Sequence, residues 1–165
     1  KGEFCMNEEP SLNPTIYAGW YDYQSRLIAA LAPLTDVQLG LRVEPGIRSI
    51  EEIVTHMIGA RGRWFQVDED AEEIAPYGRW DSPAMPVRKA NELVEGLEST
   101  WRLMQAAIAR WTPEQWAQEY PAEEPGDPAV MTRAWILWHL IEHDLHHGGE
   151  VSLTLGRHGY AAPDI

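Results

Sequence analysis

The sequence predicts an all-α fold, a four-helix bundle with one short extra helix and long loops. Four segments carry apolar residues at alternating spacings of three and four, the period of a helix that buries one face. No segment shows the strict alternation of apolar and polar residues that is typical of a strand. With 165 residues, 44% of them apolar and 24% charged, the chain is long enough for one domain with a sizeable core.

The first two long helices are predicted over residues 15–34 and 50–67. Ser49, followed three residues later by Glu52, forms a capping box, in which each side chain accepts a hydrogen bond from the other residue's backbone amide. The second helix therefore has a defined start. Between the two helices, the turn-forming pair Pro45 and Gly46 predicts a loop with at most one short turn of helix.

The third and fourth long helices are predicted over residues 87–111 and after the N-cap residue Thr132. Residues 68–86 are first acidic and then Pro-rich, which predicts a long irregular connection. Connections of this length are often functional, so this one either crosses the mouth of a site or is a plain surface crossover. Thr112 is expected to cap a short helix over residues 113–119, and a Pro- and Gly-rich loop then leads to the fourth helix.

Histidines are concentrated in the fourth long helix, in the stretch WILWHLIEHDLHHGGE at residues 135–150. Residues four apart lie on one face of a helix, so three of these histidines form a row and a fourth projects beside it. Imidazole and carboxylate groups crowded in this way favour binding of a metal ion. The four histidines are His139, His143 and His147 in the row and His146 beside it.

A single helix cannot provide all the ligands of one ion. His139 and His147 are about 12 Å apart along the helix axis, whereas ligand nitrogens lie only about 2.1 Å from a zinc ion. The row therefore supplies at most two ligands, and a third must come from another helix. Outside the cluster the sequence has only His56 and His158. His56 is the better candidate because it adjoins the apolar face of the second helix.

The composition argues against several classes of partner. The formal net charge of −13 repels nucleic acids and anionic membrane surfaces. No apolar run is long enough to span a membrane, and no signal peptide is visible. The single cysteine fits a reducing compartment, so we expect a cytoplasmic protein. That cysteine, Cys5, lies in residues 1–5, which resemble a cloning remnant, so residues 6–165 are expected to form the single native domain.

Two segments, SIEEIVTHMIGARGRWF and HDLHHGG, resemble the DinB/YfiT-like superfamily of bacterial metalloenzymes, and the resemblance spans nearly the whole chain. The superfamily motif is one histidine on the second helix and a pair four apart on the fourth, usually followed by Arg-Gly-Gln. By position, the resemblance implies that His56, His143 and His147 bind the metal. Here Gly148 and Glu150 replace the arginine and the glutamine, so substrate contacts made by those two side chains in relatives are not implied for this chain.

The resemblance also implies an activity. Some relatives are thiol-dependent S-transferases or isomerases that use zinc or nickel and a low-molecular-weight thiol such as bacillithiol or mycothiol. We therefore expect one divalent ion, zinc or nickel, and a metal-dependent S-transferase that acts on a small molecule with such a thiol as cosubstrate. A metal-dependent hydrolase and a non-catalytic metal- or ligand-binding domain are the alternatives. Relatives often form dimers, and Gly148 and Gly149 would suit a kink or the close approach of a second subunit.

Further residues are expected to support the ligands or to line the pocket. Metal-bound histidines usually donate their other ring N–H to an acceptor, and several acidic residues lie close in sequence. Histidines and tryptophans one or two turns away could form pocket walls. The candidates are Glu52, Glu142, Asp144 and Glu150 as acceptors, and His139, His146, Trp135 and Trp138 as supporting or pocket residues.

The motif H-x-x-E-H, formed by His139, Glu142 and His143, predicts a different enzyme. In inverzincin peptidases the two histidines bind zinc and the glutamate activates water. Such enzymes need a further acidic ligand well downstream, and few residues follow His143 here. The S-transferase and hydrolase interpretations therefore agree better with the sequence than a peptidase does.

Overall fold

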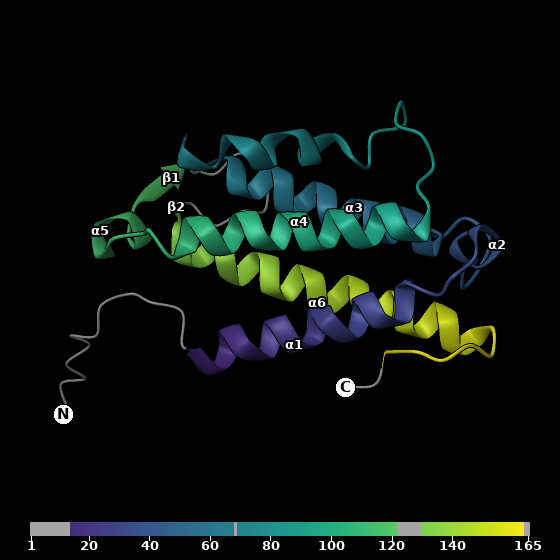
Figure 1. Ribbon diagram of the computed structural model, residues 1–165. Coiled ribbons are helices and arrows are strands. Elements are labelled where there is room, and N and C mark those ends of the chain that lie inside the picture. The colour runs from purple at the N-terminus through teal and green to yellow at the C-terminus, as the bar shows by residue number, and fades with distance from the viewer. Residues whose placement is uncertain (1–13, 68, 122–129, 164–165) are drawn as a thin grey trace.

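The structure, a computed structural model, describes residues 14–67, 69–121 and 130–163, so the predicted cloning remnant lies outside the described residues. The predicted all-α fold is confirmed. The short helix α2 (Asp36–Leu39) lies at one end of the bundle, and α5 (Pro113–Trp116) lies at the other (Figure 1). No helix in the described part of the chain is long and apolar enough to cross a membrane. Four long helices lie side by side: α1 (Pro14–Leu31), α3 (Ile50–Trp64), α4 (Ala90–Ile108) and α6 (Arg133–Arg157).

Local hydrogen bonds determine where the helices begin. The Ser49 hydroxyl accepts from the backbone N–H of Glu52 at 3.2 Å, and the Glu52 carboxylate accepts from the N–H of Ser49 at 2.6 Å. Thr112 caps α5 in the same way, and Thr132 accepts a backbone N–H at the start of α6. Each cap pairs a backbone donor that has no partner within its own helix. The predicted capping residues are therefore confirmed.

The helices are shorter than their apolar patterns predicted. α1 ends at Leu31 rather than at residue 34, and α4 begins after residue 87 and ends before residue 111. α3 gives way to a 3-10 helix, η1 (Phe65–Val67). Leu34 and Trp111 pack against the core from turns outside the helices. Apolar periodicity reports burial, which continues past the last helical residue, so it overestimates helix length.

The connection between α3 and α4 is more regular than predicted. It contains a 3-10 helix, η2 (Glu69–Arg79), which packs against both α3 and α4. The backbones approach closely, since a Cβ atom on Gly62 of α3 would lie 2.2 Å from the backbone nitrogen of Gly78. Only glycine permits that contact. The prediction of an irregular connection was therefore wrong for residues 69–79, where η2 lies alongside the bundle (Figure 1), whereas residues 80–89 contain only turns and irregular chain.

A small hairpin was missed by the sequence prediction. β1 (Glu119–Pro121) pairs antiparallel with β2 (Val130–Thr132), with Tyr120 opposite Met131. Three residues are too few to show the alternation that identifies a strand. Residues 122–129, which belong to the predicted Pro- and Gly-rich loop, lie outside the described residues. The hairpin leads directly into α6.

A buried polar network crosses the centre of the bundle. The Arg61 guanidinium of α3 donates to the Asp144 carboxylate of α6 at 2.6 Å, and both side chains are 1% exposed. Trp20 of α1 also donates to Asp144, and Arg61 donates to the Thr100 hydroxyl of α4. A buried ion pair is tolerated only when its polar atoms have such partners. The network links all four long helices and determines which residues of α6 face α3.

Candidate metal centre

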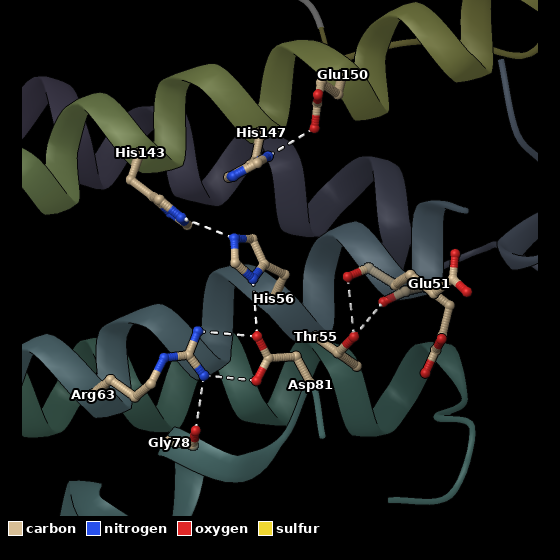
Figure 2. A network of polar contacts seen from close by, with 10 residues as sticks. Glu51, Thr55, His56, Arg63, Gly78, Asp81, His143, His147 and Glu150 are labelled. Atoms are coloured by element: carbon tan, nitrogen blue, oxygen red, sulfur yellow. Dashed lines mark hydrogen bonds and ion pairs between the residues drawn. The ribbon is translucent and has the colours of Figure 1, made fainter. Parts of the chain in front are cut away.

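Three histidines from two helices meet inside the bundle. His56 lies on α3, and His143 and His147 lie one turn apart on α6 (Figure 2). One ring nitrogen of each lies within 4.8 Å of the other two, and the Nε2 atoms of His56 and His143 are 3.3 Å apart. The ring centroids are separated by 4.4 to 5.0 Å. These three residues, called the triad below, therefore group three nitrogen donors closely enough for one metal ion to bridge them.

Carboxylates orient two of the three rings. His56 Nδ1 is 2.9 Å from Asp81 Oδ2, and His147 Nδ1 is 2.7 Å from Glu150 Oε2. Because an ionised carboxylate only accepts hydrogen bonds, each Nδ1 carries a proton, so in the neutral ring the lone pair lies on Nε2. Figure 2 shows both rings between their carboxylate and the other histidines. Histidines that bind metals are commonly supported by a carboxylate in this way.

Asp81 is the site residue that the sequence prediction missed. Arg63 holds its carboxylate with two hydrogen bonds, from Nη1 to Oδ1 at 2.6 Å and from Nη2 to Oδ2 at 2.9 Å. Burial raises the pKa of Asp81, but the hydrogen bonds from Arg63 and His56 together outweigh it and leave the pKa below its ordinary value. Asp81 is therefore ionised at neutral pH. No local pattern in the sequence connects Asp81 with His56. Spacing connects only Arg63 with it, because Arg63 lies seven residues after His56 and so on the same face of α3.

Two of the triad histidines are neutral near pH 7. Burial lowers the pKa of His143 to about 3, and the neighbouring His147 and His56 add to the effect. Burial also lowers the pKa of His147, against the opposing effect of Glu150. Neutral imidazoles keep the lone pairs that a metal ion needs. His143 Nδ1 is buried and has no hydrogen-bond partner in the part of the chain that the structure describes.

Among the predicted acceptors, Glu150 is the one that contacts a triad histidine. Glu52 lies one turn before His56, but its carboxylate belongs to the capping box and to Arg42. The hydrogen bond from Arg42 is the main cause that lowers the pKa of Glu52 to about 2, followed by the backbone of Ser49. Glu142 pairs with His139, and Asp144 lies in the buried network. The carboxylates of these three residues have other partners, so none of them contacts a triad histidine.

A cavity of about 340 Å³ lies beside His56 and is lined by both His56 and Asp81, whereas His143 and His147 are not among its lining residues. Glu52, Arg42 and Arg48 contribute to its walls, so Glu52 lines the pocket although it contacts no triad ring. The wall carries charged groups of both signs. The cavity is large enough for a small molecule rather than for a folded partner.

Two of the residues predicted to support the ligands or line the pocket, His139 and Trp135, form an aromatic stack next to the triad. His139 stacks on Trp135, with ring planes 4° apart and centroids separated by 5.2 Å, and Trp64 packs edgewise against both. The His139 ring lies 6.0 Å from that of His143. Trp138 is instead 52% exposed and the His146 side chain is 69% exposed. Trp138 is not among the residues that line the cavity beside His56, so its expected place in the pocket stays a prediction.

Gly148 is explained by a contact within the chain. A Cβ atom at this position would lie 2.0 Å from the hydroxyl oxygen of Tyr23, which comes from α1. Tyr23 is buried and donates to the backbone carbonyl of Leu145 at 3.3 Å. A Cβ on Gly149 would meet open space. The close approach at Gly148 is therefore made by a neighbouring helix, and this glycine does not call for a second subunit.

The fold and the site define a helical-bundle protein with three clustered histidines, the class that the sequence resemblance implied. The family model described as DinB family matches residues 6–165, so the chain belongs to the DinB family. It is also similar to the crystal structure of a DinB-like protein from Bacillus cereus ATCC 10987, with a TM-score of 0.70 and 18% sequence identity. That match covers 91% of this chain and 95% of the other, and at this identity it shows the fold alone. Comparison with curated proteins finds no match.

Proposed function

We propose that the triad binds one divalent metal ion, zinc or nickel, through ring nitrogens of His56, His143 and His147. The observation that carries this proposal is the convergence of three imidazoles, two of them oriented by a carboxylate behind the ring. Zinc and nickel both accept imidazole nitrogen as a ligand. Three neutral ligands leave the charge of the ion intact, and fewer than four protein ligands leave room for a substrate atom.

We further propose that the protein is a metal-dependent S-transferase that uses a low-molecular-weight thiol such as bacillithiol or mycothiol. A divalent ion at this position supplies a Lewis acid that lowers the pKa of a thiol or of water. Asp81 and Glu150 keep His56 and His147 in one tautomer and one orientation. The cavity beside His56 gives room for a small molecule. Cys5, the only cysteine of the chain, lies in the expected cloning remnant, which fits a thiol that arrives as a cosubstrate.

Two alternatives share the same centre. In a metal-dependent hydrolase of this fold, water takes the place of the thiol as nucleophile. In a non-catalytic metal- or ligand-binding domain, the open position takes a regulatory ligand. The S-transferase is preferred because relatives with this histidine pattern include thiol-dependent enzymes.

Metal binding is tested by elemental analysis of protein purified without added metal. We expect about one divalent ion per chain, and none in His143→Ala or His147→Ala. His139→Ala is the matched control, since His139 is on the same helix but stacks on Trp135 outside the triad. Full metal occupancy in His56→Ala would show that the third ligand is assigned wrongly.

Activity is tested by incubating the metal-loaded protein with monochlorobimane and a panel of cellular thiols. Conjugation that disappears in His143→Ala would support the S-transferase, and the absence of turnover with every thiol would rule it out. Hydrolysis of esters or amides without any thiol would favour the hydrolase. Tight binding of a ligand without turnover would favour the non-catalytic domain.

A further inference from the structure

A second group of potential metal ligands adjoins the triad on the outer side of α6. His146 Nε2 lies 3.7 Å from Glu150 Oε1, and potential ligand atoms of His146, His147 and Glu150 lie within 4.8 Å of one another. The side chains of His146 and Glu150 are 69% and 39% exposed, so an ion reaches them directly from solvent. The function proposed above makes no use of His146.

The two oxygens of Glu150 have different partners. Oε2 accepts from His147 Nδ1 at 2.7 Å, which leaves Oε1 facing His146. His147 Nδ1 carries the proton of that hydrogen bond, so it is not itself a free donor for a second ion. The pair that remains is one imidazole nitrogen and one carboxylate oxygen, four residues apart on a helix.

The spacing of this pair suits a single cation. Two ligand atoms bound tetrahedrally to one zinc ion, each about 2.1 Å from it, lie about 3.4 Å apart. The 3.7 Å between His146 Nε2 and Glu150 Oε1 therefore needs only a small side-chain adjustment. A helix holds positions four apart on one face, so little backbone freedom is lost on binding. The net charge of −13 favours cations near the surface.

We propose that His146 and Glu150 form a second, weaker site for a divalent cation, with solvent completing its coordination. Two protein ligands bind less tightly than three, so this site fills only after the triad. Glu150 also couples the two sites, because a cation on Oε1 withdraws charge from the carboxylate that supports His147. Each ion therefore weakens binding of the other, and the coupling is reciprocal.

The test is a titration of the metal-free full-length protein with zinc, followed by calorimetry and by equilibrium dialysis with elemental analysis. We expect a tight first step and a separate weaker second step in the wild-type protein. His146→Ala should lose the second step and keep the first. His158→Ala is the control, since it removes a histidine near the end of α6 and should keep both steps. A single step in the wild type, or a second step that persists in His146→Ala, would overturn the proposal.

Two further variants separate this site from the triad. His143→Ala should lose the tight step and keep the weak one, so failure of the triad would not hide the second site. Glu150→Gln should lose the weak step and also weaken the tight one by about 10- to 100-fold, because His147 loses a charged acceptor. A tight step of unchanged affinity in Glu150→Gln would overturn the coupling. Circular dichroism spectra of all variants check that the helices are retained.

Discussion

The three histidines of the triad are held by different means. His56 and His147 each have a carboxylate behind the ring, whereas His143 Nδ1 is buried without a hydrogen-bond partner in the described part of the chain. Carboxylates therefore determine the orientation of two rings, and burial determines the protonation of the third. These two effects can be tested separately.

Asp81→Asn tests the orientation of His56. The substitution replaces the charged carboxylate that accepts hydrogen bonds from His56 and Arg63 with a neutral amide. We therefore expect the affinity for zinc to fall by about 10- to 100-fold. Competition with a chromogenic chelator measures the affinity. Asp22→Asn is the matched control, because Asp22 forms an exposed pair with Arg26 on α1, away from the triad. Equal zinc affinity in both variants would show that Asp81 does not support the ligand.

The pKa of His143 predicts a pH dependence of stability in the metal-free protein. The pKa is about 3 in the folded protein, against 6.5 for an unperturbed histidine. Between these values the unfolded chain binds the proton and the folded protein does not, so the free energy of unfolding falls as the pH falls from about 6.5 towards 3. Urea unfolding of the metal-free protein at a series of pH values measures this slope.

His143→Gln provides the comparison for that slope. Glutamine does not titrate, so the variant should lose less stability than the wild type over the same pH range. Carboxylates that titrate in the acidic part of the range contribute equally to both proteins and cancel in the difference. Parallel pH profiles of the free energy of unfolding for the two proteins would contradict the lowered pKa of His143.

At the level of elements, the contact between α1 and α6 depends on Gly148. Gly148→Ala would bring a methyl group to within 2.0 Å of the Tyr23 hydroxyl, so we expect the free energy of unfolding to fall by roughly 1–3 kcal/mol. Gly149→Ala is the matched control: its methyl group meets open space, and alanine favours a helix over glycine by about 1 kcal/mol. Urea unfolding should therefore show a lower free energy of unfolding than wild type for Gly148→Ala and a higher one for Gly149→Ala. Destabilisation of both would point to a helix property other than the Tyr23 contact.

The connection between α3 and α4 shows where local patterns fail. Its proline and acidic residues predicted an irregular chain, yet Gly62 and Gly78 let η2 pack on α3 backbone to backbone. That packing places the residues after η2 beside His56, which is how Asp81 reaches the triad. The capping residues Ser49 and Thr132 were predictable because each bonds to a backbone amide three residues away.

At the level of the whole molecule, Asp144 joins α6 to α1 and α3. Asp144→Asn would leave the Arg61 guanidinium buried without a counter-charge, so we expect a loss of about 3–5 kcal/mol in the free energy of unfolding. Breaking the exposed pair of Asp22 with Arg26 should cost no more than about 1 kcal/mol. Thermal and urea unfolding measure both. A loss at Asp144 as small as that at Asp22 would show that the network is not needed for stability.

The assembly of the protein is also a property of the whole molecule. The homodimer expected from the family resemblance stays a prediction, and sedimentation equilibrium would test it. Gly148 no longer supports it, because Tyr23 of the same chain fills the space beside that glycine.

The sequence by itself determined the all-α class, the capped starts of α3, α5 and α6, and the placement of His143 and His147 on one face of a helix. Each of these follows from periodicity or from bonds that span three or four residues, which a local pattern records. Only the tertiary structure decided that Asp81 supports His56, that Asp144 pairs with Arg61 and that Tyr23 lies against Gly148. These contacts join residues far apart in the chain, and they form only when the packing of several helices brings the side chains together.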